Sequence, residues 1–403
     1  MKIALFTEVY QPIVNGVVAS VDALASQLRH AGHEAYTFAP HIPKGGETSG
    51  RVFRMPSLPL PSRSQYRLTL PLVARRNKRR FLSLCDIIHS HSLFITGWMA
   101  AYYARHRFRV PLVFTYHTML DNYAHYSPLG PRLTSQLTRE LTRSYANAAD
   151  AVIVPTQTAA AQLRAQDVSA PICIVPTGID MAAFGGVAPA RAAAIRRRFA
   201  IADDAPLGLL VSRLAHEKSV PVVLEAFRFV HERLPAARLL IVGGGPLADE
   251  LKAQVSAGKL RDAVRFAGSV PPDELPAYYA AADVFAFPSV TETQGLVLAE
   301  AFAAGLPVVA IDAPQTREAF ATHLAGSLVA DAAAMGEAML GLLSSQERRV
   351  CAAAHARAAA APFDVALTAS RVVSVYRAVI ASRAGKARDA DYDALFQSVR
   401  LRA

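Results

Sequence analysis

Short apolar runs alternate with longer amphipathic stretches along nearly the whole chain. Each run is about the length of a β-strand and is followed by a polar loop and then by apolar residues at helical spacing. This alternation is typical of βαβ units and predicts parallel sheets covered by helices. The predicted strands lie near residues 2–6, 35–38, 87–89, 112–115, 151–154 and 172–175, and again near 208–211, 238–242, 264–267, 284–287 and 308–311.

The predicted strands fall into two series, separated by a turn-rich segment at 176–180 and by Gly185-Gly186. Each series is long enough for one Rossmann-like domain. We expect an N-terminal domain at 1–180, completed by a C-terminal helix within about 365–403, and a second domain at 187–364. The predicted fold class is therefore α/β, with two parallel sheets whose carboxyl ends face a central cleft that binds the ligand.

The composition narrows the class of protein. A length of 403 residues with 52% hydrophobic residues can fill two cores, which excludes disordered and fibrous chains. The three cysteines are far apart, so they predict neither a disulfide framework nor a metal site, and no metal or cofactor is expected. The apolar start is too short for a signal peptide, and no apolar run reaches about 18 residues. We expect a cytoplasmic protein that attaches at most peripherally to the inner face of a membrane.

The formal net charge of +11 comes from one part of the chain. Residues 51–109 hold twelve basic side chains and a single acid, Asp86, whereas the rest of the chain is balanced. Within this part, Thr69 is placed to cap a helix that runs to about Leu84, with an apolar stripe on one side. The basic side chains expected away from or at the edge of that stripe are Arg75, Arg76, Lys78, Arg79 and Arg80.

A basic amphipathic helix is typical of a protein that binds an anionic membrane surface. It is also typical of a domain helix whose charged side is merely solvated. Nucleic acid is a weaker alternative, because no pattern of stacking aromatic residues accompanies the charge. The sequence therefore favours a lipid surface and leaves the solvated helix open.

The segment 289–301 carries the most specific chemistry. A predicted strand ends at Phe287, a polar loop follows, and a helix begins near Gly295 and Leu296, whose backbone N–H groups suit a phosphate. Glu292 lies in the loop and Glu300 in the helix, some 10 Å apart by helix geometry. Carboxylates accept paired hydrogen bonds from sugar diols, so the two suit the ends of one elongated ligand. The loop residues Thr293 and Gln294 are expected at its sugar end.

Two cations follow another predicted strand. Arg213 and Lys218 lie beyond the end of the run 208–211, where they would neutralise a diphosphate leaving group. Either alone is more typical of a solvated surface. The glycines at 243–245 also stand between a strand and a helix and permit close approach of the backbone to a ligand.

The first half contributes two further loops. Gly16 follows Asn15 after the first strand, in a pattern that suits either a plain turn or backbone amides aimed into the cleft. His117 directly follows an apolar strand and opens a segment rich in aromatic and polar residues, which also includes Tyr123, His125 and Tyr126. His89 and His91, after an earlier strand, are interpreted as structural or capping residues.

Together these motifs resemble the retaining glycosyltransferases of family 4, which have the two-domain GT-B fold, and the likeness covers nearly the whole chain. The residues that carry it, in the family's order, are Asn15-Gly16-Val17, His117, Arg213 with Lys218, the triple glycine, and the Glu292/Glu300 pair. One segment departs from the family: residues 312–318 lack its usual Gly-x-Pro-Glu pattern.

The resemblance implies a role for each residue. Glu300 would hold the ribose hydroxyls of a nucleotide-sugar donor and Glu292 the hydroxyls of its sugar, while Arg213 and Lys218 would hold the diphosphate. Gly16 would approach the diphosphate from the first domain. His117 would sit beside the transferred sugar, either as a catalytic group or as one that positions the sugar. In this family the leaving diphosphate can itself take the acceptor's proton.

The segments 115–126 and 291–295 are most similar to diacylglycerol glucosyltransferases and plant-type sulfolipid synthases. This implies transfer of a hexose, glucose from UDP-glucose being favoured, to a membrane lipid such as diacylglycerol, with Tyr123, His125 and Tyr126 near the acceptor. Alternatives are transfer from GDP-mannose or another donor to a different lipid or a polysaccharide, a nucleotide-sugar 2-epimerase, and a binding protein without turnover. The sequence leaves the oligomeric state open.

Overall fold

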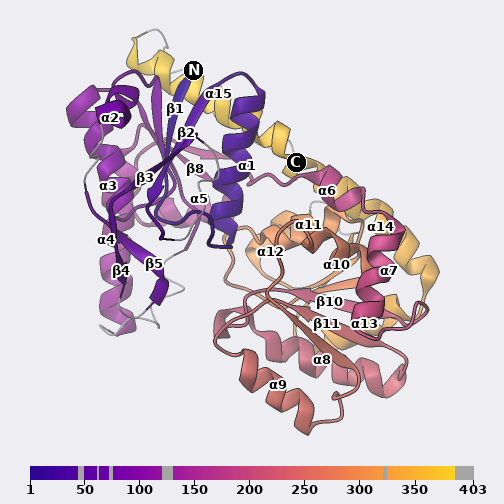
Figure 1. Ribbon diagram of the computed structural model, residues 1–403. Helices are drawn as coiled ribbons and strands as arrows, with labels where there is room; N and C mark the ends of the chain where they lie inside the picture. Colours follow the sequence, from indigo (N-terminus) through magenta and orange to yellow (C-terminus); the bar gives the residue numbers. More distant parts are fainter. Residues whose placement is uncertain (44–49, 61–62, 72–75, 120–129, 321–324, 386–403) are drawn as a thin grey trace. The chain divides into compact units, whose positions relative to one another are not determined.

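The computed structural model describes residues 1–43, 50–60, 63–71, 76–119, 130–320 and 325–385. The chain divides into two compact units (Figure 1). The first comprises residues 1–178 together with the chain from Val365 onward, and the second is Ile179–Asp364. Each unit is built around one parallel sheet.

The first unit has a seven-stranded parallel sheet in the order β3-β2-β1-β6-β7-β8-β9. Its strands are β1 (Lys2–Phe6), β2 (Glu34–Pro40), β3 (Val52–Met55), β6 (Ile87–Ser90), β7 (Leu112–Thr115), β8 (Ala151–Val154) and β9 (Ile172–Ile174). Its helices are α1 (Gly16–His30), α2 (Arg76–Leu82), α3 (Ile95–Ala101), the π-helix η1 (Tyr102–Phe108), α4 (Pro131–Ala148), α5 (Gln157–Ala165) and α15 (Val365–Arg383).

The side chains along each strand point alternately to the two faces of the sheet, and this explains the layers of the first unit. In β1, Ile3 and Leu5 join a core cluster that includes residues of α1 and α15. Ala4 and Phe6 point to the other face, into a cluster with residues of α3, α4 and α5. Successive side chains of a strand point to opposite faces, so a strand buried on both faces is apolar throughout.

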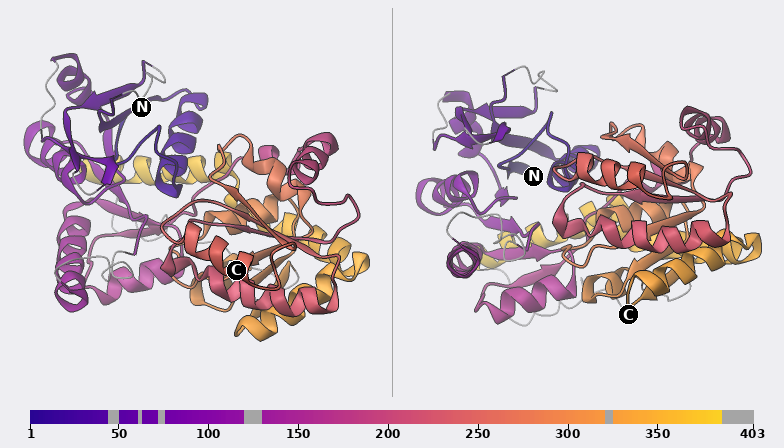
Figure 2. Two further views of the ribbon diagram at one scale, coloured as in Figure 1. Left: turned by 60° about the horizontal axis from the view of Figure 1, so that its bottom comes forward. Right: turned by 90° about the horizontal axis from the view of Figure 1, so that it is seen from below.

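The helix α15 completes the first unit from the far end of the chain, and Figure 2 shows it among the elements of the N-terminal part. Among the described helices it alone has the length and apolar composition to cross a membrane. Its apolar residues Val372, Val375, Tyr376 and Val379 nevertheless pack into the core beneath the sheet. This burial explains the composition of α15 without a membrane.

The second unit has a six-stranded parallel sheet in the order β12-β11-β10-β13-β14-β15. Its strands are β10 (Leu207–Val211), β11 (Arg238–Val242), β12 (Val264–Gly268), β13 (Val284–Phe287), β14 (Val308–Ile311) and β15 (Gly326–Val329). Its helices are α6 (Met181–Gly185), α7 (Pro189–Arg198), the short 3-10 helix η3 (His216–Lys218), α8 (Val220–Arg233), α9 (Ala248–Ala257), α10 (Leu275–Ala281), α11 (Leu296–Ala303), α12 (Pro314–Ala319), α13 (Ala332–Leu343), α14 (Gln346–Ala360) and the 3-10 helix η4 (Ala361–Phe363).

Neighbouring residues of β10 again point to opposite faces of the sheet. Leu209 packs with residues of α10, α11 and α14, whereas Leu210 packs with residues of α8, α9 and α13. Helices therefore cover both sides of the sheet, as Figure 1 shows.

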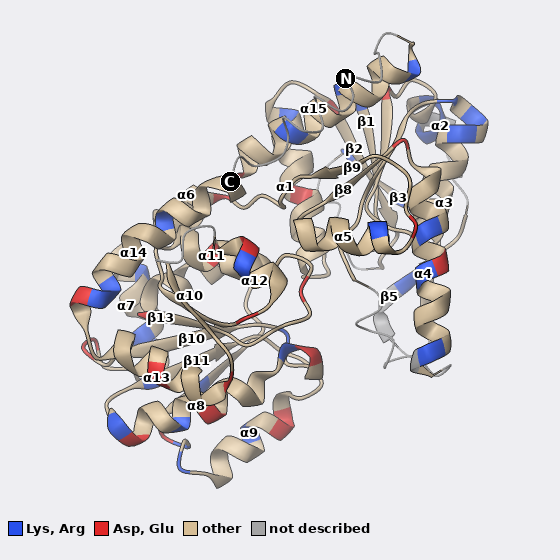
Figure 3. Ribbon diagram, turned by 180° about the vertical axis from the view of Figure 1, so that it is seen from behind, with Lys and Arg blue, Asp and Glu red and all other residues tan. Residues whose placement is uncertain are grey.

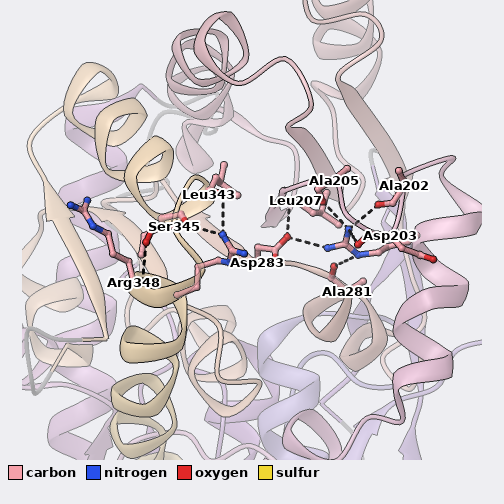
Figure 4. A network of polar contacts seen from close by, with 12 residues as sticks. Ala202, Asp203, Ala205, Leu207, Ala281, Asp283, Leu343, Ser345 and Arg348 are labelled. Carbon is pink, nitrogen blue, oxygen red and sulfur yellow. Dashed lines mark hydrogen bonds and ion pairs between the residues drawn. The ribbon is translucent and has the colours of Figure 1, made fainter.

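A polar network fixes the start of β10 and β13 (Figure 4). The carboxylate of Asp283 accepts a hydrogen bond from the Leu207 N–H at 2.8 Å and from Arg196 Nη2 at 3.0 Å. Arg349 approaches its other oxygen at 3.6 Å. Arg196 also donates to the carbonyls of Ala205, at 2.8 Å, and of Ala281, at 2.9 Å. The starts of β10 and β13, which are distant in sequence, are thus joined by hydrogen-bonded charged side chains.

All of the predicted strands are present, and the sequence pattern missed β3, β15 and the antiparallel hairpin of β4 (Ser57–Leu60) with β5 (Arg63–Thr69). The predicted helix from Thr69 to about Leu84 was wrong at its start. Thr69 is the last residue of β5, where its hydroxyl donates to Glu8 Oε1 at 3.1 Å instead of capping a helix. The helix α2 begins only at Arg76.

Lys78 was also predicted wrongly as a solvated cation. It is buried, its Nζ donates to the Arg54 carbonyl, and it lies 5.8 Å from the centre of the Phe53 ring. A lysine on an amphipathic helix can bury its stem and satisfy its ammonium with a carbonyl, which periodicity does not reveal. Arg79 and Arg80 are exposed, as predicted. Arg75 lies outside the described residues.

Candidate functional site

In the second unit, the loop after β13 is fixed against the loop after β10. The hydroxyls of Ser289 and Thr291 donate to the carbonyl of Glu217 at 3.3 and 3.1 Å. Gln315, on α12, donates through Nε2 to the carbonyl of Val290 at 2.6 Å. The segment that departs from the family pattern thus supports the loop that carries Glu292.

With the two loops held together by these hydrogen bonds, two of the predicted site residues are in contact. Lys218 Nζ donates to Glu292 Oε1, and both side chains are largely buried. Arg213, five residues before Lys218, has a half-exposed side chain and lies 3.9 Å from Glu217 Oε1. A cation suited to phosphate and a carboxylate suited to hydroxyls therefore adjoin at the ends of β10 and β13.

Glu300 lies in the second turn of α11 and contacts Tyr279 of α10. The tyrosine hydroxyl donates to Glu300 Oε2 at 2.7 Å. Burial raises the pKa of Glu300 to about 7, and the hydrogen bond from Tyr279 opposes that rise. The carboxyl group is therefore poised to ionise near neutral pH.

Gly295 is the N-cap of α11 and lies in the left-handed region, with φ +76°. A β-carbon there would lie 3.1 Å from the Phe287 ring, so both conformation and space favour glycine. The next residue, Leu296, is the first of the helix, and Thr293 and Gln294 before it are buried.

The glycines at 243–245 lie close to the chain's own backbone, and their predicted approach to a ligand stays a prediction. A β-carbon on Gly243, whose φ is +134°, would lie 1.8 Å from the Ser212 carbonyl oxygen, and one on Gly245 would lie 2.2 Å from that of Leu214. The close approach is therefore to the chain's own backbone at 212–214. These glycines place the segment that carries Arg213.

In the first unit, three histidines lie together at the ends of β6 and β7. His117 Nε2 is 2.9 Å from His91 Nδ1, and the ring of His91 is 4.1 Å from that of His89. His89 is bonded on both sides, through Nδ1 to the Tyr376 hydroxyl at 2.6 Å and through Nε2 to the Thr115 hydroxyl at 2.7 Å. The sequence singled out His117 but gave no sign that His91 contacts it.

Burial keeps these histidines neutral. It lowers the pKa of His117 to about 4 and, with a contribution from the charge of His117, lowers the pKa of His89 to about 3. The pKa of His91 is well below its usual value for the same reason, with the charges of His89 and His117 adding to the effect. At neutral pH the cluster can exchange hydrogen bonds but carries no charge.

The loop after β1 leads directly into the helix α1. Asn15 is the N-cap of α1, and its Oδ1 accepts from the Val18 N–H at 2.9 Å. Gly16 is the first residue of that helix and is exposed. Tyr123, His125 and Tyr126 lie outside the described residues.

A carboxylate that the sequence reading passed over also lies in this region. Glu8 Oε2 accepts from both the backbone N–H and the hydroxyl of Thr96, at 3.0 and 2.9 Å, at the start of α3. Its other oxygen accepts from Thr69. An acid directly after the first strand was the available signal. Within the described part of the chain, no three His, Cys, Asp or Glu side chains are grouped to hold a metal ion.

Comparison with known proteins gives two family matches. Residues 14–183 match the model described as Glycosyltransferase Family 4, and residues 192–359 match Glycosyl transferases group 1. An alpha-monoglucosyldiacylglycerol synthase of Streptococcus pneumoniae is 30% identical over 81% of this chain and 75% of its own length. One of Acholeplasma laidlawii is 31% identical over 77% and 80%. A GDP-mannose-dependent alpha-mannosyltransferase of Mycobacterium tuberculosis is 31% identical over 82% and 84%.

Solved structures share the fold. The Anabaena protein Alr3699/HepE in complex with UDP superposes with a TM-score of 0.74 at 21% identity, over 93% of this chain and 99% of that one. Sucrose-phosphate synthase from Thermosynechococcus elongatus superposes with a TM-score of 0.75 at 22% identity, over 94% and 99%. At these identities the likeness concerns the fold alone, and it confirms the predicted pair of Rossmann-like domains.

Proposed function

Since the chain belongs to the family 4 glycosyltransferases, which retain the configuration of the hexose they transfer from a nucleotide sugar, we propose that it moves glucose from UDP-glucose to a membrane lipid such as 1,2-diacylglycerol. The acceptor hydroxyl oxygen bonds to the anomeric carbon of the sugar as the bond from that carbon to the diphosphate breaks. The acceptor's proton passes to the leaving diphosphate. The products are the glycolipid and UDP.

The contact between Lys218 and Glu292 carries the donor part of the proposal. A bound diphosphate competes with Glu292 for the ammonium of Lys218, and Arg213 adds a second, accessible cation. Cations at this point stabilise the charge that develops on the leaving group. The carboxylate of Glu292, released from Lys218, can then accept hydrogen bonds from hydroxyls of the sugar. Donor binding thus replaces one ion pair with two ligand contacts.

Glu300 is proposed to hold the ribose. Its ionised carboxylate can accept hydrogen bonds from the ribose hydroxyls, and Tyr279 orients that carboxylate by donating to one of its oxygens. The backbone N–H groups at Gly295 and Leu296 are proposed to meet the diphosphate at the start of α11, and Thr293 and Gln294 to border the sugar. Gly16 is proposed to approach the diphosphate from the first unit, and His117 to adjoin the transferred sugar.

The lipid acceptor is supported by the two similar glucosyldiacylglycerol synthases and by the surface of the first unit. Phe94, Trp98 and Tyr102 recur every four residues along α3 and η1, and 43–55% of each side chain is exposed. The Trp98 ring packs edge-on against Tyr145 of α4 at 5.3 Å. The amphipathic rings of Trp and Tyr are enriched where a protein meets the boundary between lipid and water.

The helix α4 extends this surface. Leu133 and Leu137 are about half exposed and, like the residues of α3, stand four positions apart. Arg132 and Arg139 are exposed nearby in sequence, and Figure 3 shows basic positions along α4 and on α2. Apolar side chains beside arginines suit an anionic leaflet, where each cation contributes about 1 kcal/mol. We therefore propose that the exposed apolar residues of this surface contact the membrane together with Arg79 and Arg80.

The main rival is another donor or acceptor, because mannosyltransferases are about equally identical to this chain. Transfer from GDP-mannose would leave the roles of Glu300, Arg213 and Lys218 unchanged. A nucleotide-sugar 2-epimerase is a different class of enzyme, and it would convert its substrate without an acceptor.

The test is to supply UDP-glucose and GDP-mannose, each with a labelled sugar, to the protein with liposomes that contain or lack diacylglycerol. We expect label in lipid only with UDP-glucose and diacylglycerol together. Label in lipid from GDP-mannose would overturn the donor, and conversion of UDP-glucose without lipid would favour the epimerase. In a separate assay with anionic vesicles, Trp98→Ser with Leu137→Ser should lower the fraction of protein that sediments with the lipid, whereas Val350→Ser, an exposed change in the second unit, should not.

A further inference from the structure

The histidine proposed to adjoin the sugar is held by a second histidine. His91 Nδ1 and His117 Nε2 are 2.9 Å apart, and their rings stack at 24° with centres separated by 5.2 Å. His91 is only 5% exposed and directly follows β6, so the sheet fixes its position. Between two neutral imidazoles, one nitrogen must donate the shared proton and the other must accept it.

The far side of His91 indicates which ring donates. His91 Nε2 is buried and has no hydrogen-bond partner among the described residues. The hydroxyl of Thr368, on α15, is buried and unpartnered in the same sense. Both residues line one cavity of about 30 Å³ in the first unit, which has room for one water molecule. A threonine hydroxyl can donate its proton to a bare imidazole nitrogen, directly or through a water molecule.

We propose that His91 is a positioning residue that carries its proton on Nδ1 and donates it to His117 Nε2, which fixes His117 in the tautomer with a proton on Nδ1. Hydrogen bonds then run in one direction, from Thr368 through His91 to His117. The part of this inference that concerns the substrate rests on the proposed function, in which His117 adjoins the transferred sugar. In that role, His117 donates a hydrogen bond to the transferred sugar and cannot accept the proton of the acceptor hydroxyl at Nδ1.

His89 supports this arrangement from the other side. Its ring lies 4.1 Å from that of His91, and both of its nitrogens are already bonded, to Tyr376 and Thr115. His89 therefore fixes the orientation of the His91 ring by packing and does not compete for the His91 nitrogens. The burial that keeps all three rings neutral makes a defined tautomer possible at neutral pH.

The tautomer can be measured without any substrate. In protein labelled with ¹⁵N-histidine, two-dimensional NMR distinguishes a protonated ring nitrogen from a bare one, and the signals lost in His117→Asn and His91→Asn identify the two rings among the twelve. We expect protonated Nδ1 and bare Nε2 for both histidines. A proton on His117 Nε2 would overturn the proposal. Because this readout needs no transfer reaction, it remains valid even if the proposed acceptor or donor is wrong.

Two substitutions test the effect of His91 on activity. His91→Phe keeps a stacked ring but removes the donor, whereas His91→Asn places an amide N–H near the position of Nδ1. We expect His91→Phe to lower kcat about tenfold, equivalent to one hydrogen bond of roughly 1.4 kcal/mol, with the KM for the donor changed less than about twofold. His91→Asn should recover most of the loss and restore the His117 signal of the native tautomer. Equal kcat values for the two variants, at equal thermal stability, would show that His91 acts only by packing.

Discussion

The Tyr279 hydroxyl donates to Glu300 Oε2 at 2.7 Å and thereby joins α10 to the second turn of α11. This bond occupies one carboxylate oxygen of Glu300 and opposes the effect of burial, which raises the pKa of the acid to about 7. A group proposed to bind the ligand is thus held at a cost to the stability of the fold.

The first prediction concerns that cost. The folded pKa of Glu300, near 7, exceeds the unfolded value, near 4.5. The free energy of unfolding therefore falls as the pH rises from 4.5 through 7. Above pH 7, Glu300→Gln should therefore stabilise the second unit, by up to about 3 kcal/mol. Urea denaturation at pH 8 and pH 4 measures the difference, which should nearly vanish at pH 4. A destabilised variant at pH 8 would contradict the assigned cause.

The same substitution should weaken donor binding. UDP-glucose has no group that ionises near neutral pH in its diphosphate diester, so any change in its affinity across this range reports on the protein. We expect its affinity for the native protein to rise between pH 6 and pH 8 as Glu300 ionises, and the affinity of Glu300→Gln to be lower and flat. Isothermal titration calorimetry measures both. A flat profile for the native protein would remove Glu300 from the ribose site.

Lys218 provides a prediction about charge. Lys218→Ala removes a phosphate-binding cation and leaves Glu292 without its partner, so UDP should bind at least about tenfold more weakly. The exposed Lys252, on α9, offers a matched control of equal charge, and Lys252→Ala should bind UDP normally. Unchanged UDP binding by Lys218→Ala would refute the proposed diphosphate contact.

Acid should destabilise the first unit. A histidine whose folded pKa is depressed stabilises the fold above its unfolded pKa, near 6.5, and that contribution is lost as pH falls toward the folded pKa, about 4 for His117 and about 3 for His89. Each such histidine lowers the free energy of unfolding by about 1 kcal/mol at pH 5.5, one pH unit below 6.5. The melting temperature should fall between pH 7 and pH 5, and His89→Gln should reduce that slope even if it lowers stability at pH 7.

The triple glycine gives a test of packing. Gly243→Ala places a β-carbon 1.8 Å from the Ser212 carbonyl oxygen, so the second unit should lose more than about 2 kcal/mol of stability. Gly268→Ala is the control, because its φ is also positive, at +73°, but nothing lies within 4 Å of the added carbon. It should cost only about 1–2 kcal/mol. Equal losses in urea denaturation would show that backbone strain alone sets the requirement for glycine.

The sequence predicted the architecture well because buried parallel strands have a clear signature. β11, β13 and β14 were located at their observed bounds from apolar runs and flanking turns. The edge strands β3 and β15 are short and only partly buried, so their residues lack that signature. The hairpin of β4 and β5 was missed, and only its last residue, Thr69, was assigned to the predicted helix.

The sequence by itself also predicted the side chains of the candidate site, because the combined motifs and their resemblance to a family select Glu292, Glu300, Lys218 and His117. Only the tertiary structure decided how those side chains are held. Tyr279 meets Glu300, and His91 meets His117, across sequence separations of 21 and 26 residues. Such contacts arise where elements pack, and packing depends on side-chain directions that local periodicity does not encode. For the same reason, Lys78, which looks like a surface cation in the sequence, is buried against Phe53.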